Sequence, residues 1–336
     1  MTEEIYSMFK KIFPFVSRAE KTAINIINNK NNTIFEKRAP DHALIGCAIV
    51  NQNAILLLVV DEAYRNMGIG SELLKMCEDT IIHNGFDRAV LGAGFDYLMP
   101  GVPTSKKYAQ SVHENLCSEV NDTASAFFEK RGYVHSWKAC NCFDMKMSLS
   151  TIEDSIESIG STIHGVTYRW AVMDDLDEII KCADDACQYQ EEKFSVYYNH
   201  SPLYEADTPQ KVLVAVKNHK IIGTLIISIE TEGKDLGSVG CTCVSSKMSH
   251  QGIGTNLVRL GTKYLKDIGL SNASLSYTYT GLDQMYGAVG YEISTYYFMG
   301  EKRNLRKQTG MMPAASPTKV CQSRCFLPEV DAEEFT

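Results

Sequence analysis

Gly68 and Gly70 follow a run of apolar residues in the segment AILLLVVDEAYRNMGIGS, which spans residues 54–71. Glycine has no side chain, so it lets a ligand approach the backbone closely. If a helix begins here, the amide groups of its first turn lack partners and its dipole favours negative charge. A strand, a glycine loop and a helix in this order predict a site for phosphate or pyrophosphate.

The spacing of the loop excludes two common phosphate-binding motifs. No Gly-Lys-Ser/Thr follows it, as a Walker loop requires, and the third glycine of a dinucleotide-binding fingerprint is missing. An ordinary strand-to-helix turn with two glycines is the alternative that the loop alone leaves open.

Two segments in the first half resemble motifs of the GNAT acetyltransferases. The loop is similar to motif A, Arg/Gln-x-x-Gly-x-Gly/Ala, with Arg65 as its first residue and the run Val60 to Arg65 before it. Residues 121–133, NDTASAFFEKRGY, resemble the later element Asn-x-x-Ala-x-x-x-Tyr-Glu-Lys-x-Gly-Phe. The resemblance implies an α+β fold, an α/β/α sandwich around a central mixed, mostly antiparallel sheet.

The second half of the chain repeats this pattern more faintly. Val244 lies eight residues before Gly252, as Val60 lies eight before Gly68, and Gly252-Ile253-Gly254 repeats the Gly-Ile-Gly. The chain therefore resembles bacterial proteins with two tandem GNAT folds.

The second copy departs from the family motifs at two positions. Ser249 stands where the first copy has Arg65, and Tyr279 stands where the later motif has its Asn, before residues 286–291, YGAVGY. We therefore expect the better cofactor site in the first copy.

Hydrophobic periodicity predicts the same elements in both halves. In the first half, helical segments are expected within residues 1–29. Three strands follow at residues 33–37, 43–51 and 54–60, then a helix at residues 69–83 and a further strand at residues 88–92. In the second half, strands are expected at residues 167–170, 212–216, 221–229, 238–244 and 273–277. The later helix is expected at residues 253–266.

These elements predict two domains and two connecting segments. The N-terminal GNAT domain, expected to bind acetyl-CoA, spans residues 1–148, and a C-terminal GNAT-like domain spans residues 166–302. Between them, residues 149–165 are rich in Ser, Ile and acids and are expected to form a linker. The composition of residues 303–336 predicts a mobile tail.

The resemblance implies acetyl-coenzyme A as co-substrate. Carried over residue by residue, Leu58, Val59 and Val60 would face the pantetheine arm, and Asn121 would lie near the thiol end. The pyrophosphate would be bound by the loop and the first residues of the helix, namely Arg65, Asn66, Met67, Gly68, Ile69, Gly70 and Ser71.

In this family a neutral amine attacks the thioester directly, so catalysis rests mainly on positioning. An acid must still protonate the departing thiolate, and the family usually places a tyrosine in that role. Phe128 holds this position in the first copy, and Tyr286 holds it in the second. The first copy thus combines the better cofactor loop with the poorer acid.

The first copy also contains an insertion. From Gly70 to Phe128 is 58 positions, against 32 between the equivalent residues of the second copy. The extra chain leaves the end of a central strand, where loops flank the acceptor site in this fold. Asp96 and Tyr97 are therefore candidates for substrate contact, with Tyr97 as a replacement acid; a purely structural loop is the alternative.

Composition narrows the function further. The formal net charge of −8 argues against a nucleic-acid surface, and no run approaches the ~18 apolar residues of a membrane span. Eleven cysteines in irregular spacing predict reduced thiols in a cytoplasmic protein, and none forms the repeated Cys-x-x-Cys pairs of a zinc site. We expect a monomer or homodimer without a metal.

These observations predict an N-acetyltransferase that acts on a primary amine of a small molecule. The phrase YLMPGVP, residues 97–103, resembles one in bacterial tandem GNAT proteins, some of which act on glucosamine, so an amino sugar is the leading acceptor. Two other functions stay open: a non-catalytic acyl-CoA-binding regulator and a protein N-acetyltransferase.

Overall fold

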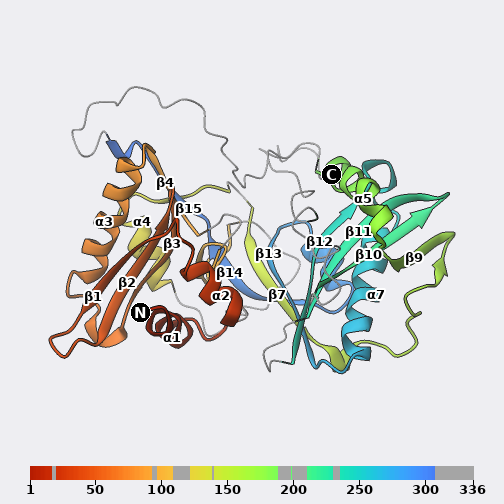
Figure 1. Ribbon diagram of the computed structural model, residues 1–336, viewed down its shortest axis with the longest axis horizontal. Coiled ribbons are helices and arrows are strands. Elements are labelled where there is room, and N and C mark those ends of the chain that lie inside the picture. The colour runs from red at the N-terminus through yellow and green to blue at the C-terminus, as the bar shows by residue number, and fades with distance from the viewer. Residues whose placement is uncertain are drawn as a thin grey trace. The chain divides into compact units, whose positions relative to one another are not determined.

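The protein is a mixed α+β chain with two sheets, each mostly antiparallel, as predicted (Figure 1). The computed structural model describes residues 1–16, 20–92, 97–108, 122–137, 140–187, 198, 210–229 and 235–306. In this part of the chain, none of the helices combines the length and the apolar character that spanning a bilayer requires.

The elements follow the predicted order closely. The helices are α1 (Thr2–Ile12), α2 (Glu20–Ile27), α3 (Ile69–His83), α4 (Thr123–Glu129), α5 (Leu176–Ala186), α7 (Ile253–Asp267) and α8 (Asp283–Gly287). The strands are β1 (Thr33–Arg38), β2 (Leu44–Asn51), β3 (Ala54–Val60), β4 (Arg88–Leu91), β5 (Val102–Thr104), β6 (Val134–His135), β7 (Cys142–Ser148), β8 (Thr162–Ile163), β9 (Val166–Trp170), β10 (Gln210–Lys217), β11 (Lys220–Ile229), β12 (Leu236–Val244), β13 (Asn272–Tyr279), β14 (Glu292–Phe298) and β15 (Gly300–Arg303).

The chain divides into two compact units. Within the described residues, the first comprises residues 1–108, 122–142 and 295–306, and the second comprises residues 143–294. They differ from the contiguous ranges 1–148 and 166–302 of the sequence analysis at the end of each half. The expected tail after residue 306 lies outside the described residues.

The difference arises because each half contributes to the sheet of the other half: β15 joins the first sheet, and β5 and β7 join the other. The first sheet runs β1-β2-β3-β4-β15-β6, so β15, from the end of the second half, lies beside β4. The other sheet contains β10-β11-β12-β13 in the equivalent order, and there β7, from the end of the first half, lies beside β13. Each sheet is therefore completed by a strand from the other half of the sequence.

The first sheet has helices on both faces. Helix α3 packs on β1 to β4, and α1 packs on β2 and β3 from the other side (Figure 1). Strand β2 is buried on both faces because its neighbours and both helices cover it. The core under α3 includes Ala48 and Val50 of β2 with Leu73 and Cys77 of the helix.

Strands β3 and β4 pair in parallel over few of the described residues. Their register covers Ala54 opposite Val90 and Ile55 opposite Leu91. Strand β4 ends at Leu91, and the next residue, Gly92, has a φ of +68° that favours glycine and would place a Cβ 2.5 Å from the Pro100 carbonyl oxygen. Strand β3 continues to Val60, and its last residues line a cavity that is described below.

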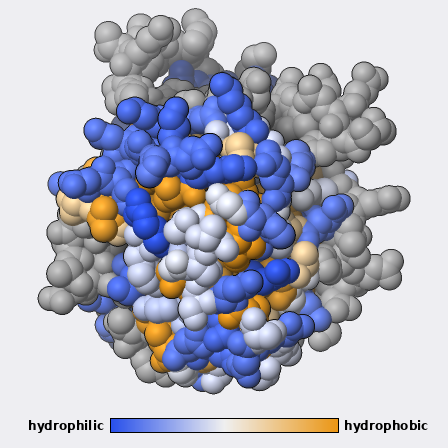
Figure 2. All heavy atoms as spheres, turned by 90° about the vertical axis from the view of Figure 1, so that its right-hand side faces the viewer, coloured by the Kyte–Doolittle hydropathy of each residue, from blue (hydrophilic) through white to orange (hydrophobic). Residues whose placement is uncertain are grey.

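The second unit repeats the helix-on-sheet packing of the first. Gly46 of β2 would place a Cβ 3.2 Å from Ile69 of α3, and Gly223 of β11 would place one 3.1 Å from Ile253 of α7. A glycine at this strand position therefore lets the helix approach closely in both copies. Figure 2, seen from the side of α5, α7 and β9, shows a surface that is mostly hydrophilic, with hydrophobic side chains in small groups.

Candidate functional site

The glycine loop connects β3 to α3 through a short 3-10 turn, η1 (Glu62–Tyr64). Asn66 and Gly68 adopt left-handed backbone conformations, with φ of 63° and 86°. Gly68 is the N-cap of α3 and has no side chain to cap the amides of the first turn. A Cβ built on Gly68 would meet no atom within 4 Å, and the start of a helix stabilises an anion bound beside it.

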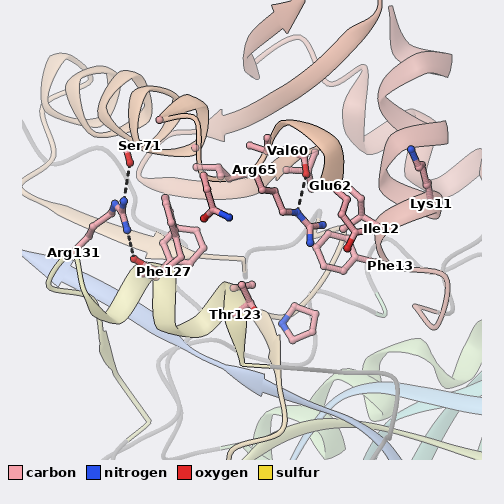
Figure 3. A pocket seen from close by; sticks show the side chains of 18 of the residues that line it. Lys11, Ile12, Phe13, Val60, Glu62, Arg65, Ser71, Thr123, Phe127 and Arg131 are labelled. Carbon is pink, nitrogen blue, oxygen red and sulfur yellow. Dashed lines mark hydrogen bonds between the residues drawn. The ribbon is translucent and has the colours of Figure 1, made fainter.

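This loop forms one wall of a cavity of ≈ 670 Å³ (Figure 3). The cavity is lined by eight of the residues that the sequence predicted for the cofactor, Leu58, Val59, Val60, Arg65, Asn66, Gly68, Gly70 and Ser71. Met67 and Ile69 do not line it, because Met67 is 68% exposed and Ile69 packs against the core under α3. Asn121 lies outside the described residues.

Other lining residues come from segments that the sequence analysis did not assign to the site. The end of α1 and the residues after it contribute one group, α4 and its flanks another, and the rest are single residues: Lys11, Ile12, Phe13, Phe15, Glu62, Pro103, Thr123, Ala124, Phe127, Phe128 and Arg131. The residues between 123 and 131 lie in the segment that resembles the later family element, whereas those near α1 and in β5 belong to no motif and could not be predicted from spacing.

Two arginines line the cavity at different places (Figure 3). The Arg65 Nε donates to the Val60 carbonyl oxygen at 3.2 Å. The Arg131 guanidinium donates to the Phe127 carbonyl at 2.8 Å and to the Ser71 hydroxyl at 2.7 Å. Positive charge therefore lies at two places in the cavity wall, at the loop before α3 and beside Ser71 in the first turn of the helix.

The nearby carboxylate of Asp61 is held by a lysine. Its Oδ2 lies 2.6 Å from the Lys11 Nζ, and its Oδ1 accepts a hydrogen bond from the Ala63 amide. The hydrogen bond from Lys11 lowers the pKa of Asp61, which therefore stays ionised and paired. Asp61 does not line the cavity, whereas Glu62 does.

Phe128 occupies the position where the family usually has its acid tyrosine. Its ring is 5% exposed and packs edge-on against Phe127 and Tyr133, with centroids 5.1 Å and 5.4 Å apart. The hydroxyl groups that line the cavity belong to Ser71 and Thr123.

The insertion reaches the cavity through β5. Asp122 at the start of α4 accepts hydrogen bonds from the Thr104 hydroxyl at 2.7 Å and the Ser105 amide at 2.9 Å. Burial raises the pKa of Asp122, but these hydrogen bonds outweigh it and lower the pKa overall. Asp122 thus fixes β5 to α4 and places Pro103 in the cavity wall.

The sequence analysis proposed Tyr97 and Asp96 of the insertion as contacts for the substrate. Tyr97 is half-buried and is not among the residues that line the described cavity, and Asp96 lies outside the described residues. Their predicted roles stay predictions.

The loop of the second copy has the same backbone conformation as that of the first. A 3-10 turn, η5 (Ser246–Met248), leads to His250 with φ 59° and to Gly252 with φ 75°, the N-cap of α7. The space above the helix differs: a Cβ on Gly254 would lie 2.9 Å from the Met285 sulfur, whereas one on Gly70 would lie 3.4 Å from the Phe127 ring.

Tyr286, the tyrosine of the second copy, is 4% exposed. Its hydroxyl lies 3.1 Å from the Thr242 hydroxyl, on β12. Burial raises the pKa of Tyr286 well above its ordinary value, so the phenol stays protonated. The hydroxyl is therefore part of an internal hydrogen bond.

A family comparison agrees with this geometry. The model of the acetyltransferase (GNAT) family matches residues 2–96 and 173–291. The chain belongs to the GNAT family. The two matches correspond to the two copies inferred from the Gly-Ile-Gly repeat. A comparison with curated protein sequences gives no significant match.

Solved structures show the tandem arrangement as well. The glucosamine N-acetyltransferase region of a fungal multi-domain β-N-acetylglucosaminidase matches with TM-score 0.69 and 19% identity, over 90% of this chain and 37% of that one. A GNAT protein of Sphaerobacter thermophilus matches with TM-score 0.65 and 16% identity, over 89% of this chain and 91% of that one. A tandem GNAT protein from the clavulanic acid biosynthesis pathway matches with TM-score 0.63 and 11% identity, over 90% of this chain and 95% of that one. At identities this low, the structural matches show the fold alone. That fold is two tandem GNAT folds, as predicted.

The described residues hold no group of three or more His, Cys, Asp or Glu side chains that could bind a metal ion. The cavity is lined by the start of α3, two arginines and the apolar residues 58–60 of β3. Such a set can bind an elongated ligand that is anionic at one end and weakly polar along its length.

Proposed function

We propose that this GNAT protein is an acetyl-CoA-dependent N-acetyltransferase that binds its co-substrate in the first copy. The observation that carries the proposal is the cavity that is lined both by the loop and first turn of α3 and by the last residues of β3. The helix amides and the Gly68 loop would hold the pyrophosphate, and Leu58 to Val60 would lie along the pantetheine arm. Asn121 near the thiol end stays part of the proposal.

The reaction requires little from the protein beyond positioning. The amine nitrogen forms a bond to the acetyl carbon, the carbon–sulfur bond breaks, and the proton lost by the amine passes to solvent or a base. The departing thiolate takes up one proton. Phe128 has no hydroxyl to supply it, so the acid must be another group, for which Tyr97 or a water molecule is our candidate.

The second copy is proposed to be structural. Its loop keeps the left-handed Gly252, but Met285 packs over Gly254, and the Tyr286 hydroxyl is bonded to Thr242. It also lacks the arginine that the first copy has as Arg65. The space beside Gly252 is as open as that beside Gly68, so the proposal rests on the missing arginine, the approach of Met285 to Gly254 and the bonded Tyr286 hydroxyl.

The acceptor is proposed to be the primary amine of a small molecule. The fungal structure of similar fold is a glucosamine N-acetyltransferase region, so glucosamine is the first acceptor to test. A protein N-acetyltransferase and a non-catalytic acyl-CoA-binding regulator are the competing functions. Cytoplasmic location and a monomeric or homodimeric state stay predictions.

A thiol-release assay tests this function directly. The intact protein is incubated with acetyl-CoA and, separately, with glucosamine, a polyamine, an amino acid and a lysine-containing peptide. Release of coenzyme A that depends on a small amine supports the proposal. Release that depends on the peptide alone would favour the protein acetyltransferase, and acetyl-CoA binding without release would favour the regulator.

A further inference from the structure

The cavity of the first copy reaches both faces of the first sheet. Ser71 and Arg131 line it on the side of α3, whereas Ile12 and Phe13, at the end of α1, line it on the other side (Figure 3). The last residues of β3 separate these two walls. In the proposed function the α3 wall holds the pyrophosphate, so the wall at the end of α1 is left for the amine.

The wall at the end of α1 consists of apolar side chains that the described residues leave partly uncovered. Ile12, Phe13 and Phe15 all line the cavity, and each is only partly buried. The rings of Phe13 and Phe15 meet edge to face, with centroids 6.2 Å apart and an interplanar angle of 84°. Partly exposed rings in a cavity wall favour an apolar ligand, because its binding removes their surface from water.

One carboxylate accompanies this apolar wall. Glu62 lines the cavity on the same side as Ile12 and Phe13 (Figure 3). Lys11 is paired with Asp61, and Glu62 forms no ion pair with a cation of the described residues. A primary amine reaches the protein mostly as an ammonium ion, which a carboxylate attracts. The wall therefore suits a cation that has an apolar body.

A hydroxyl-rich acceptor finds few partners on this side. Among the described residues that line the cavity near the end of α1, the polar side chains are Glu62 and the paired Lys11. A sugar carries a hydroxyl on most of its carbons, and each hydroxyl that leaves water without a new hydrogen bond weakens binding. An amine with a hydrocarbon body loses no such hydrogen bonds.

We propose that the acceptor of the first copy is a primary amine with an apolar, ring-bearing body, which packs against Phe13 and Phe15. The inference rests on the proposed function, because it requires an acetyl donor in the same cavity. It ranks such an amine above glucosamine, which the comparison of folds suggests. Phe13 and Phe15 determine acceptor specificity through contact with the body of the amine, whereas Glu62 attracts its charge.

Steady-state thiol release by the intact protein at saturating acetyl-CoA, with phenethylamine and glucosamine as probes, tests the proposal. We expect kcat/KM to be about tenfold or more higher for phenethylamine, because its ring is buried against the wall. Phe13 also packs on the buried Phe9 ring, with centroids 5.9 Å apart, so Phe15 is the residue to change. Phe15→Ala should lower kcat/KM for phenethylamine about tenfold and leave the value for glucosamine within about twofold. Phe15→Leu should keep part of the preference, because the side chain stays apolar.

Val134→Ala is the control, since this apolar side chain is 60% exposed and does not line the cavity. It should leave both kcat/KM values unchanged. The ratio of the two values is the decisive measure, because a loss of folding in Phe15→Ala would lower both together. A wild-type ratio at or below one, a ratio that Phe15→Ala leaves unchanged, or release with neither amine would overturn the acceptor class and leave the proposed function standing. Failure of acetyl-CoA to bind would overturn the proposed function, and this inference with it.

Discussion

Gly68 and Gly252 hold the same left-handed backbone, with φ of 86° and 75°, at the N-caps of two equivalent 15-residue helices. A Cβ at either position would meet no atom within 4 Å, so alanine adds only backbone strain, about 1 to 2 kcal/mol. We expect Gly68→Ala and Gly252→Ala to lower the free energy of unfolding by similar amounts in urea denaturation. A loss several times larger at one site would show that the two loops are not equivalent.

Tyr286→Phe separates a structural from a chemical role of the second copy. Because the Tyr286 hydroxyl is buried against Thr242, its removal should destabilise the protein by about 1 kcal/mol and leave turnover nearly unchanged. Steady-state rates with acetyl-CoA and the best amine provide the measurement. A large fall in kcat with normal stability would mean that this hydroxyl takes part in the reaction.

The buried ion pair between Arg88 of β4 and Glu301 of β15 joins the two halves of the sequence within the first sheet. Glu301→Met should cost about 3 to 5 kcal/mol, because it removes the carboxylate that pairs with the largely buried Arg88 guanidinium. Replacing both residues with Met should restore much of that loss.

The surface pair Lys75 and Asp79 provides the control for this cycle. Its side chains are 74% and 50% exposed, so Asp79→Ala should cost less than about 1 kcal/mol. Equal losses for Asp79→Ala and Glu301→Met in urea denaturation would argue against an essential place for β15 in the first sheet.

Asp122 makes the stability of the first copy depend on pH in the acidic range. Its pKa in the folded protein is below the ordinary value of 3.8, so its contribution to stability is present above that value and is lost as the pH falls below it. Asp122→Asn should therefore lower stability by about 1 kcal/mol at pH 7, after allowance for its solvent exposure, and the difference should shrink towards pH 3. Thermal unfolding at pH 7, 5, 4 and 3 measures it. A difference that grows on acidification would have the wrong sign.

The sequence predicted those parts of the fold that are encoded locally. The helix expected at residues 69–83 is α3, Ile69–His83, because its apolar spacing and its glycine start lie within one short segment. The strands on either side were found for the same reason. The exchange of β7 and β15 was missed, because pairing between Arg88 and Arg303 joins residues far apart in sequence and leaves no local pattern.

The residues of the cavity also differ in whether the local sequence could predict them. Its motif residues, such as Arg65 and Gly68, could be predicted because their spacing is characteristic of a helix start that binds phosphate. Phe13 and Pro103 could not, since each is a single residue brought to the wall by tertiary packing. Tyr97 was chosen from the position of a loop alone, and a loop position does not determine where a side chain points.

The central claim is that acetyl-CoA binds once per chain, at the loop of the first copy. Calorimetric titration of the wild type, Gly68→Ala and Gly252→Ala with acetyl-CoA tests it most directly, because the two substitutions are matched in backbone conformation and in open space. We predict one site in the wild type, affinity about tenfold or more weaker in Gly68→Ala because the methyl group enters the space of the phosphates, and affinity within about twofold of wild type in Gly252→Ala. Two sites in the wild type, or equal weakening by the two substitutions, would contradict the account.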